Sequence, residues 1–76
     1  MNIPSDYPSC EIVTIGTELL LGRIVDTNSA YLARELAGCG VWPRYRTAVG
    51  DRMDEMVQVL LTAAERCDLV VVPGGL

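Results

Sequence analysis

Three short segments carry the residue types that could do chemistry in this sequence. Residues 16–22 (GTELLLG) follow an apolar, β-branched run, residues 26–29 (DTNS) stand where a helix can begin, and residues 74–75 form a glycine pair after a second apolar run. Glycine turns let a backbone approach a ligand closely, and a helix start exposes N–H groups suited to an anion. These segments therefore predict a ligand site.

The glycine spacing excludes two common phosphate-binding motifs. A dinucleotide fingerprint would need glycine in place of Glu18, and a P-loop would need a Gly-Lys-Ser or Gly-Lys-Thr triplet. The three leucines at 19–21 favour a loop that folds back onto the sheet. A dehydrogenase-type nucleotide fold is therefore not indicated.

Each candidate also has a plainer interpretation. Asn28 or Ser29 can simply cap a helix, and Asp51 fits a helix cap better than a catalytic group. Glu18 can be a solvated loop acid. The glycine pair at 74–75 can be an ordinary turn, although its place after an apolar strand favours close approach to a ligand.

The charged residues narrow the chemistry. The chain has 76 residues with ten acids, six bases and a formal net charge of −4, and it has neither histidine nor lysine. Catalysis by this chain would therefore depend on carboxylates, hydroxyls, thiols or a carboxylate-held metal. The absence of a basic run argues against binding to nucleic acid, which needs clustered cations.

The cysteines and the N-terminus indicate a cytoplasmic protein. Cys10, Cys39 and Cys67 are odd in number and widely spaced, which predicts free thiols rather than disulfides or a zinc site. Residues 1–9 are expected to be a flexible lead-in and do not resemble a signal peptide. No run approaches the about 20 apolar residues that a membrane span needs.

Hydrophobic patterning predicts alternating strands and helices in residues 10–76. Pro43 and the alternating arginines indicate an edge strand over 41–49, and the unbroken apolar run over 69–72 predicts the most buried strand. A strand is expected at 11–15 and a helix from Asn28 or Ser29 to about Gly38. A second helix after Asp51 is expected to turn one apolar side inward, made of Met56, Val57, Leu60, Ala64 and Cys67.

This β-α-β-α-β order predicts an α/β fold with a parallel sheet. The edge character of the second strand gives the spatial order 2-1-3, and right-handed crossovers place the two helices on opposite faces. The turn at Gly16 and Thr17 should then face Gly74 and Gly75 at the carboxyl end of the sheet, where ligands bind in open α/β folds.

Taken together, the motifs resemble the competence/damage-inducible protein A (CinA) family. The resemblance is carried by EIVTIGTELLLGRIVDTNS (11–29), YLAREL (31–36), VGD (49–51) and DLVVVPGGL (68–76). It runs from about Cys10 to Leu76 and covers about the first half of the family's N-terminal, molybdopterin-binding (MoaB/Mog-like) domain. It implies a three-layer α/β/α fold with a mostly parallel sheet, of which the first β-α-β-α-β part is present.

The resemblance also implies ligands and site residues. The ligand would be a pterin or nucleotide, and the intact family would hydrolyse an ADP-ribose-like pyrophosphate with Mg²⁺ or another divalent cation. Catalytic candidates are Glu18 and Asp26. The ligand-binding residues implied by the matching motifs are Gly16, Thr17, Glu18, Asp26, Asn28, Gly50, Asp51, Gly74 and Gly75.

Two functional hypotheses follow. The family domain continues with a Gly-Pro-Thr segment and paired aspartates, and often with an amidase domain, so the resemblance implies that these 76 residues hold part of the site. The leading hypothesis is a partial nucleotide- or molybdopterin-binding domain. The alternative is a non-catalytic module that binds ligand weakly or acts through assembly. An uncovered strand edge would favour homo-oligomers or aggregation.

Overall fold

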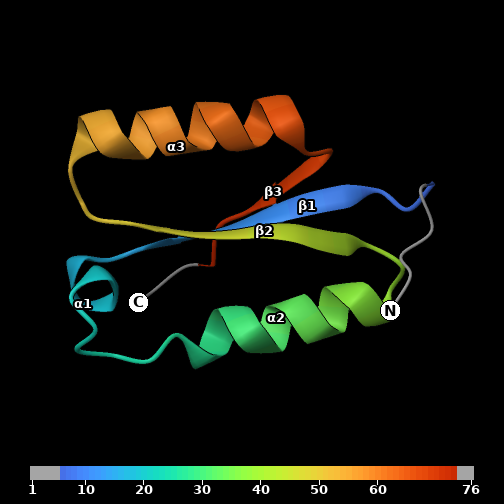
Figure 1. Ribbon diagram of the computed structural model, residues 1–76, viewed down its shortest axis with the longest axis horizontal. Helices are drawn as coiled ribbons and strands as arrows, with labels where there is room; N and C mark the ends of the chain where they lie inside the picture. The colour runs from blue at the N-terminus through green and yellow to red at the C-terminus, as the bar shows by residue number, and fades with distance from the viewer. Residues whose placement is uncertain (1–5, 74–76) are drawn as a thin grey trace.

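The computed structural model describes residues 6–73, which fold into a three-stranded parallel sheet between helices (Figure 1). The helix α2 covers one face of the sheet and α3 covers the other, and the short α1 lies at one end. The predicted α/β class, the parallel sheet and the order 2-1-3 are confirmed. The elements are β1 (Ser9–Ile15), α1 (Thr17–Leu20), α2 (Thr27–Gly38), β2 (Trp42–Val49), α3 (Met53–Arg66) and β3 (Leu69–Val71).

The strand β1 occupies the centre of the sheet. It pairs with β2 from Ser9 to Ile15 and with β3 at residues 10–12. The register with β2 shifts after Cys10, because Pro43 and Tyr45 face consecutive residues of β1 and Arg44 is left without a partner. This bulge and the missing N–H of Pro43 suit an edge position, so the predicted edge strand is confirmed.

The prediction that residues 69–72 form the most buried strand is wrong. That position belongs to β1, whose first five residues are buried, whereas Leu69 is 45% and Val72 is 43% exposed. Within residues 6–73, β3 has a strand neighbour on one side only, and it pairs over three residues. An apolar run indicates a strand that can be buried, but burial also requires neighbours.

The main core lies between the sheet and α3. Val13, Val49 and Ala63 are buried there. The predicted inward side of this helix was wrong in part, since Val57 is 46% exposed and Ala64 is also exposed. The residues of α3 that face the sheet recur three or four positions apart along the helix, and this spacing places them on one helical face. The partly buried residues that complete this core are Ile15, Met56, Val59, Leu60 and Val70.

The helix α2 begins and ends at residues other than those predicted. Its N-cap is Asp26, whose side chain accepts a hydrogen bond from the Ser29 N–H, so neither Asn28 nor Ser29 is the cap. At its C-terminus the Gly40 N–H donates to the Ala37 carbonyl and the Val41 N–H donates to the Leu36 carbonyl. This is a Schellman motif, and it requires the positive φ of +85° found at Gly40.

An ion pair joins the central strand β1 to the last residue of α3. Glu11 is fully buried in β1, and its Oε1 and Oε2 accept hydrogen bonds from Arg66 Nε (2.7 Å) and Nη2 (2.8 Å). The Thr47 hydroxyl also donates to this carboxylate. The Arg66 guanidinium lies 3.7 Å from the centroid of the Tyr45 ring. These hydrogen bonds, chiefly the one from Arg66, lower the pKa of Glu11 below its ordinary value despite burial.

In residues 6–73 every helix is too short or too polar to cross a membrane.

Candidate functional site

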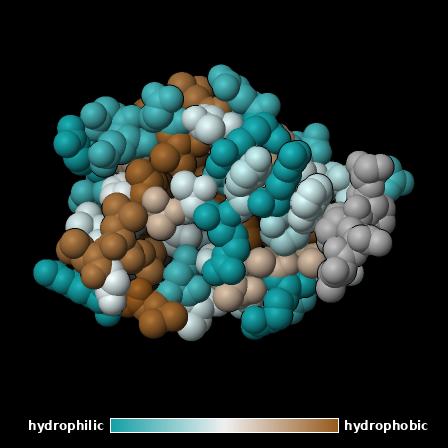
Figure 2. Space-filling view, in the orientation of Figure 1, coloured by the Kyte–Doolittle hydropathy of each residue, from teal (hydrophilic) through white to brown (hydrophobic). Residues whose placement is uncertain are grey.

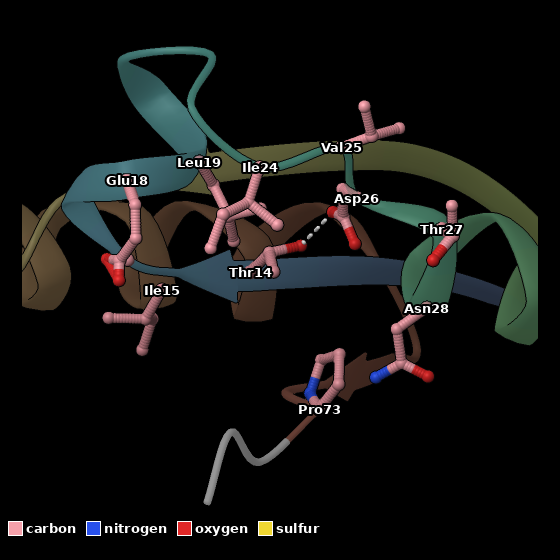
Figure 3. Close-up of a pocket in the computed structure, with 11 residues that line it drawn as sticks. Thr14, Ile15, Glu18, Leu19, Ile24, Val25, Asp26, Thr27, Asn28 and Pro73 are labelled. Carbon is pink, nitrogen blue, oxygen red and sulfur yellow. Dashed lines mark hydrogen bonds between the residues drawn. The ribbon is translucent and has the colours of Figure 1, made fainter.

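A pocket of about 340 Å³ lies at the carboxyl end of β1, between α1, the following loop and the start of α2. Figure 3 shows Glu18 and Asn28 toward opposite ends of this pocket, with Pro73 between them on the side of β3. In parallel α/β sheets this is the end at which ligands bind. The lining residues are Thr14, Ile15, Gly16, Glu18, Leu19, Ile24, Val25, Asp26, Thr27, Asn28 and Pro73.

Four of the predicted ligand-binding residues come together in this pocket. Gly16 and Glu18 line it at the start of α1, and Asp26 and Asn28 line it at the start of α2. The Glu18 carboxylate folds back toward Gly16, because a Cβ added at Gly16 would lie 3.2 Å from Glu18 Oε1. A side chain at Gly16 would therefore crowd this carboxylate. The ligand-binding role of all four residues stays a prediction.

Three other predicted residues meet on the opposite side of α1. The Thr17 hydroxyl donates to Asp51 Oδ1 at 3.2 Å, and a Cβ at Gly50 would lie 3.4 Å from Leu20 Cδ1. Gly50 lines a separate hollow of about 340 Å³ between α1 and α3. The prediction that Asp51 caps α3 is wrong, since the N-cap is Arg52 and no side chain caps this helix.

The predicted glycine pair, Gly74 and Gly75, lies outside the described residues. Its predicted position opposite Gly16 and Thr17 is therefore neither supported nor contradicted. Pro73, the last described residue, lines the pocket together with Gly16.

Asp26 is the centre of a hydrogen-bond network that holds one wall of the pocket. Its Oδ1 accepts from the Ser29 N–H at 3.0 Å, and its Oδ2 accepts from the hydroxyls of Ser29 (2.7 Å) and Thr14 (2.9 Å). Figure 3 shows the bond from Thr14, which ties β1 to the start of α2. Arg46 Nη2 on β2 donates to the Ser29 hydroxyl at 3.1 Å.

This network keeps Asp26 ionised. Its pKa is lowered below the ordinary value, first by the hydrogen bond from the Ser29 hydroxyl and then by the Ser29 N–H, the Thr14 hydroxyl and the charge of Arg46. A carboxylate held in this way accepts hydrogen bonds and does not supply protons near neutral pH.

Sequence reasoning missed Thr14, Ser29 and Arg46 as members of this network. Thr14 was assigned only to a strand, and the alternation of arginines on β2 was interpreted only as a polar edge. A signal was present, since Thr14 is the polar residue nearest the carboxyl end of the predicted central strand. The contact between Arg46 and Ser29 depends on the register of β2 and could not be found from spacing.

The donor set of the pocket fits a hard cation in part. Glu18 and Asp26 are its carboxylates, with Asn28 and Thr27 as further oxygen donors. Among residues 6–73 no three acidic or cysteine side chains gather closely enough to hold a metal alone. Mg²⁺ needs fewer protein ligands, because it usually binds one or two carboxylates, several waters and the phosphates of a substrate.

The surface around the pocket is apolar. Figure 2 shows hydrophobic side chains gathered over α1 and the loop that follows it. Leu20, Leu21, Ile24 and Val25 are all more than half exposed there, and Val25 is 79% exposed. Of these four, Ile24 and Val25 line the pocket itself, where they offer a surface suited to a flat, weakly polar ring.

A parallel sheet with helices on both faces and a pocket at the carboxyl end of its central strand defines an α/β ligand-binding domain. Residues 11–76 match the family model described as "Probable molybdopterin binding domain". The chain belongs to this family, and within it to the competence-damage-inducible, or CinA, type.

Relatives and a solved structure agree with this assignment. The chain is 54% identical over 66 residues to a Halothermothrix orenii protein named "Putative competence-damage inducible protein", and 47% identical over 66 residues to the CinA-like protein of Deinococcus deserti. Each alignment covers 87% of this chain and 16% of the relative. The crystal structure of CinA from Thermoplasma acidophilum, described as having unknown function, matches with a TM-score of 0.86 and 38% identity. That match covers 95% of this chain and 43% of the solved chain.

Proposed function

We propose that this domain binds a phosphorylated heterocycle, molybdopterin or a nucleotide pyrophosphate, in the pocket at the carboxyl end of β1. The observation that carries the proposal is the composition of that pocket: apolar walls meet two carboxylates and a helix start within about 340 Å³. This volume lies in the range of small-molecule sites, about 300–1,000 Å³. The family match supports the same class of ligand.

The apolar walls are suited to the ring of such a ligand. Ile15, Leu19 and Ile24 line the pocket together, and Pro73 lines it on the side of β3 (Figure 3). Burial of a flat ring against these side chains would remove apolar surface from water, which contributes about 25 cal/mol per Å². The polar groups would then orient the ligand.

Asn28 is the residue at the start of α2 that is best placed to contact a phosphate. The Ser29 N–H is bound by Asp26, and the Thr27 N–H donates to the Val25 carbonyl at 3.0 Å. The side-chain amide of Asn28, which lines the pocket, therefore supplies a donor beside the positive end of the helix dipole.

A divalent cation would reconcile a phosphorylated ligand with the acidic pocket. No arginine lines the pocket as described, whereas Glu18 and Asp26 both do. We propose that Glu18 holds Mg²⁺ or a similar hard cation together with waters and the ligand's phosphates, while Asp26 faces the ligand from the other end of the pocket; the cation would polarise the phosphoanhydride of a bound pyrophosphate. In a longer protein of this family, further residues would complete the site. The reaction would then be cytoplasmic hydrolysis of an ADP-ribose-like compound.

The test is titration of the purified chain with ADP-ribose and Mg²⁺ in a calorimeter, with product analysis by chromatography. We expect binding that needs Mg²⁺ and is lost in Glu18→Gln, while Glu65→Gln, an exposed position on α3, leaves it unchanged. Turnover above the Glu18→Gln background would show that these residues suffice for chemistry. Binding without turnover would favour the non-catalytic alternative, and absence of binding to ADP-ribose and to a pterin phosphate would contradict the proposal.

The alternative of an assembly module is favoured by one observation. Leu69 and Val72, beside the unpaired side of β3 in the described sheet, are both more than 40% exposed. An uncovered apolar strand edge favours pairing between chains. Light scattering at micromolar concentration should then show dimers or larger species, and Leu69→Lys should shift them toward monomer. A monodisperse monomer would contradict this alternative.

A further inference from the structure

Arg46 lies outside the candidate pocket yet contacts the network that holds it. It is an exposed residue of the edge strand β2, and it does not line the pocket of about 340 Å³. Its guanidinium nevertheless donates from Nη2 to the hydroxyl of Ser29, which is 1% exposed. Ser29 in turn contacts Asp26, a residue that lines the pocket.

Chemistry fixes the direction of these hydrogen bonds. Arginine can only donate, and an ionised carboxylate can only accept. The Ser29 hydroxyl must therefore accept from Arg46 and donate its own proton to Asp26 Oδ2, 2.7 Å away. A smaller hollow of about 260 Å³, lined by Thr14, Asp26, Ser29 and Arg46 among others, lies along this path.

Most hydrogen-bond acceptor positions of the Asp26 carboxylate are already used within the protein. A carboxylate has about four acceptor positions, two on each oxygen. The hydroxyls of Thr14 and Ser29 use both positions on Oδ2, and the Ser29 N–H uses one on Oδ1. A single acceptor position on Oδ1 is left, whereas the Glu18 carboxylate accepts no hydrogen bond within the described part of the chain.

We infer that Arg46 is a positioning residue of the ligand site, which acts through the Ser29 hydroxyl to fix the carboxylate of Asp26. This inference rests on the proposed function, and it assigns different parts to the two carboxylates. Glu18 contacts the cation or ligand most fully. Asp26 presents one oxygen in a fixed direction, and Arg46 on β2 maintains that direction through its hydrogen bond to Ser29.

A purely structural role would look different. If Arg46 only stabilised the start of α2, its removal would lower the melting temperature but leave the ligand affinity of the folded protein unchanged. If it positions Asp26, the affinity of the folded protein must fall. The effect must also vanish once the Ser29 hydroxyl is absent, because Arg46 would then have no path to the carboxylate.

The experiment measures the affinity of the full chain for ADP-ribose with Mg²⁺, by calorimetry at a temperature where every variant is folded. We expect Arg46→Gln to weaken binding about tenfold, as expected when a buried hydroxyl loses its partner, and Arg46→Lys to recover part of the loss. The control Arg44→Gln makes the same change on the same strand, where the guanidinium lies over the rings of Trp42 and Tyr45 and makes no side-chain hydrogen bond within the described residues. It should leave the affinity unchanged.

A double substitution tests the path itself. In a Ser29→Ala background, the further change Arg46→Gln should have no effect on affinity. An equal tenfold loss in that background, or a lower melting temperature with unchanged affinity in Arg46→Gln alone, would overturn the inference.

An NMR measurement separates this inference from the proposed function. In the free protein, Arg46→Gln should shift the Ser29 amide and the Asp26 carboxyl carbon resonances, while Arg44→Gln should not. If the wild-type chain binds neither ADP-ribose nor a pterin phosphate, the proposed function fails, and these resonances still test whether Arg46 fixes the Asp26 carboxylate. Unchanged resonances in Arg46→Gln would overturn the inference.

Discussion

Replacing Glu11 by glutamine should be among the most damaging single-atom changes in this domain. The substitution keeps the shape of the side chain but turns one acceptor oxygen into an NH₂ group. The two oxygens of Glu11 now face Arg66 Nε and Nη2 at 2.7 and 2.8 Å. In the variant a donor would face a donor at a residue that is fully buried.

The expected cost follows from these contacts. Leaving a buried polar group without its partner costs about 1–3 kcal/mol, so we expect a loss of about 2 kcal/mol. A chain of this size is stabilised by only about 4–11 kcal/mol, at about 0.05–0.15 kcal/mol per residue. Since 1 kcal/mol shifts the melting temperature of a small domain by about 4–8 °C, the variant should melt roughly 10 °C lower.

The loss should also depend on pH. The pKa of Glu11 is lower in the folded than in the unfolded chain, mainly because of the hydrogen bond from Arg66. Its stabilising contribution is therefore present above the unfolded pKa of about 4.3 and disappears as the pH falls through the folded value. The difference between wild type and Glu11→Gln should be full at pH 7 and should shrink steadily below about pH 4.

The assay is thermal unfolding followed by circular dichroism at pH 7 and at several values below pH 4. Glu65→Gln is the control, because it makes the same change at an exposed position one residue before Arg66. Equal melting temperatures for wild type and Glu11→Gln at pH 7 would refute this reasoning. If the difference in melting temperature between wild type and Glu11→Gln stayed constant below pH 4, the loss would come from the shape of the side chain and not from its charge.

Three further predictions concern the ends of α2 and the thiols. Gly40→Ala should destabilise the fold by about 1 kcal/mol, because alanine is strained at a φ of +85°, whereas Gly38→Ala inside the helix should be neutral or stabilising in the same urea titration. Asp26→Ala should cost about 1 kcal/mol or more in thermal unfolding, because it removes the N-cap, and an unchanged melting temperature would contradict the assignment. Burial raises the pKa of the Cys10 thiol, so a thiol reagent should modify exposed Cys39 at once and Cys10 only on unfolding; equal rates would contradict the described burial.

The sheet order could be predicted because its signals are local and physical. Pro43 has no N–H to donate to a neighbouring strand, and the arginines of β2 alternate in a way that a strand buried between two neighbours would not allow. These features placed β2 at an edge, and the right-handed crossover rule then placed the helices. The family resemblance came from the motifs themselves, and the family match confirms it.

The details that were missed depend on contacts between distant residues. The phase of α3 was misjudged because Ala63 and Ala64 are equally apolar, and only packing against Val13 and Val49 selects one of them. The burial of Glu11 depends on Arg66, which is 55 positions away along the chain. Asp26 was predicted as a ligand-binding residue but not as the N-cap of α2. That role depends on the loop after α1 bringing Asp26 against Thr14 of β1.

The two edges of the sheet differ in whether another strand can pair with them. Along β2, the missing N–H of Pro43, the unpartnered Arg44 at the bulge and the charge of Arg46 all oppose the docking of another strand. The described part of β3 has none of these features. A strand added to this sheet, from the same polypeptide or from another one, would therefore join beside β3, on the side where Pro73 borders the pocket. Extension of the sheet and enclosure of the ligand would then be one event.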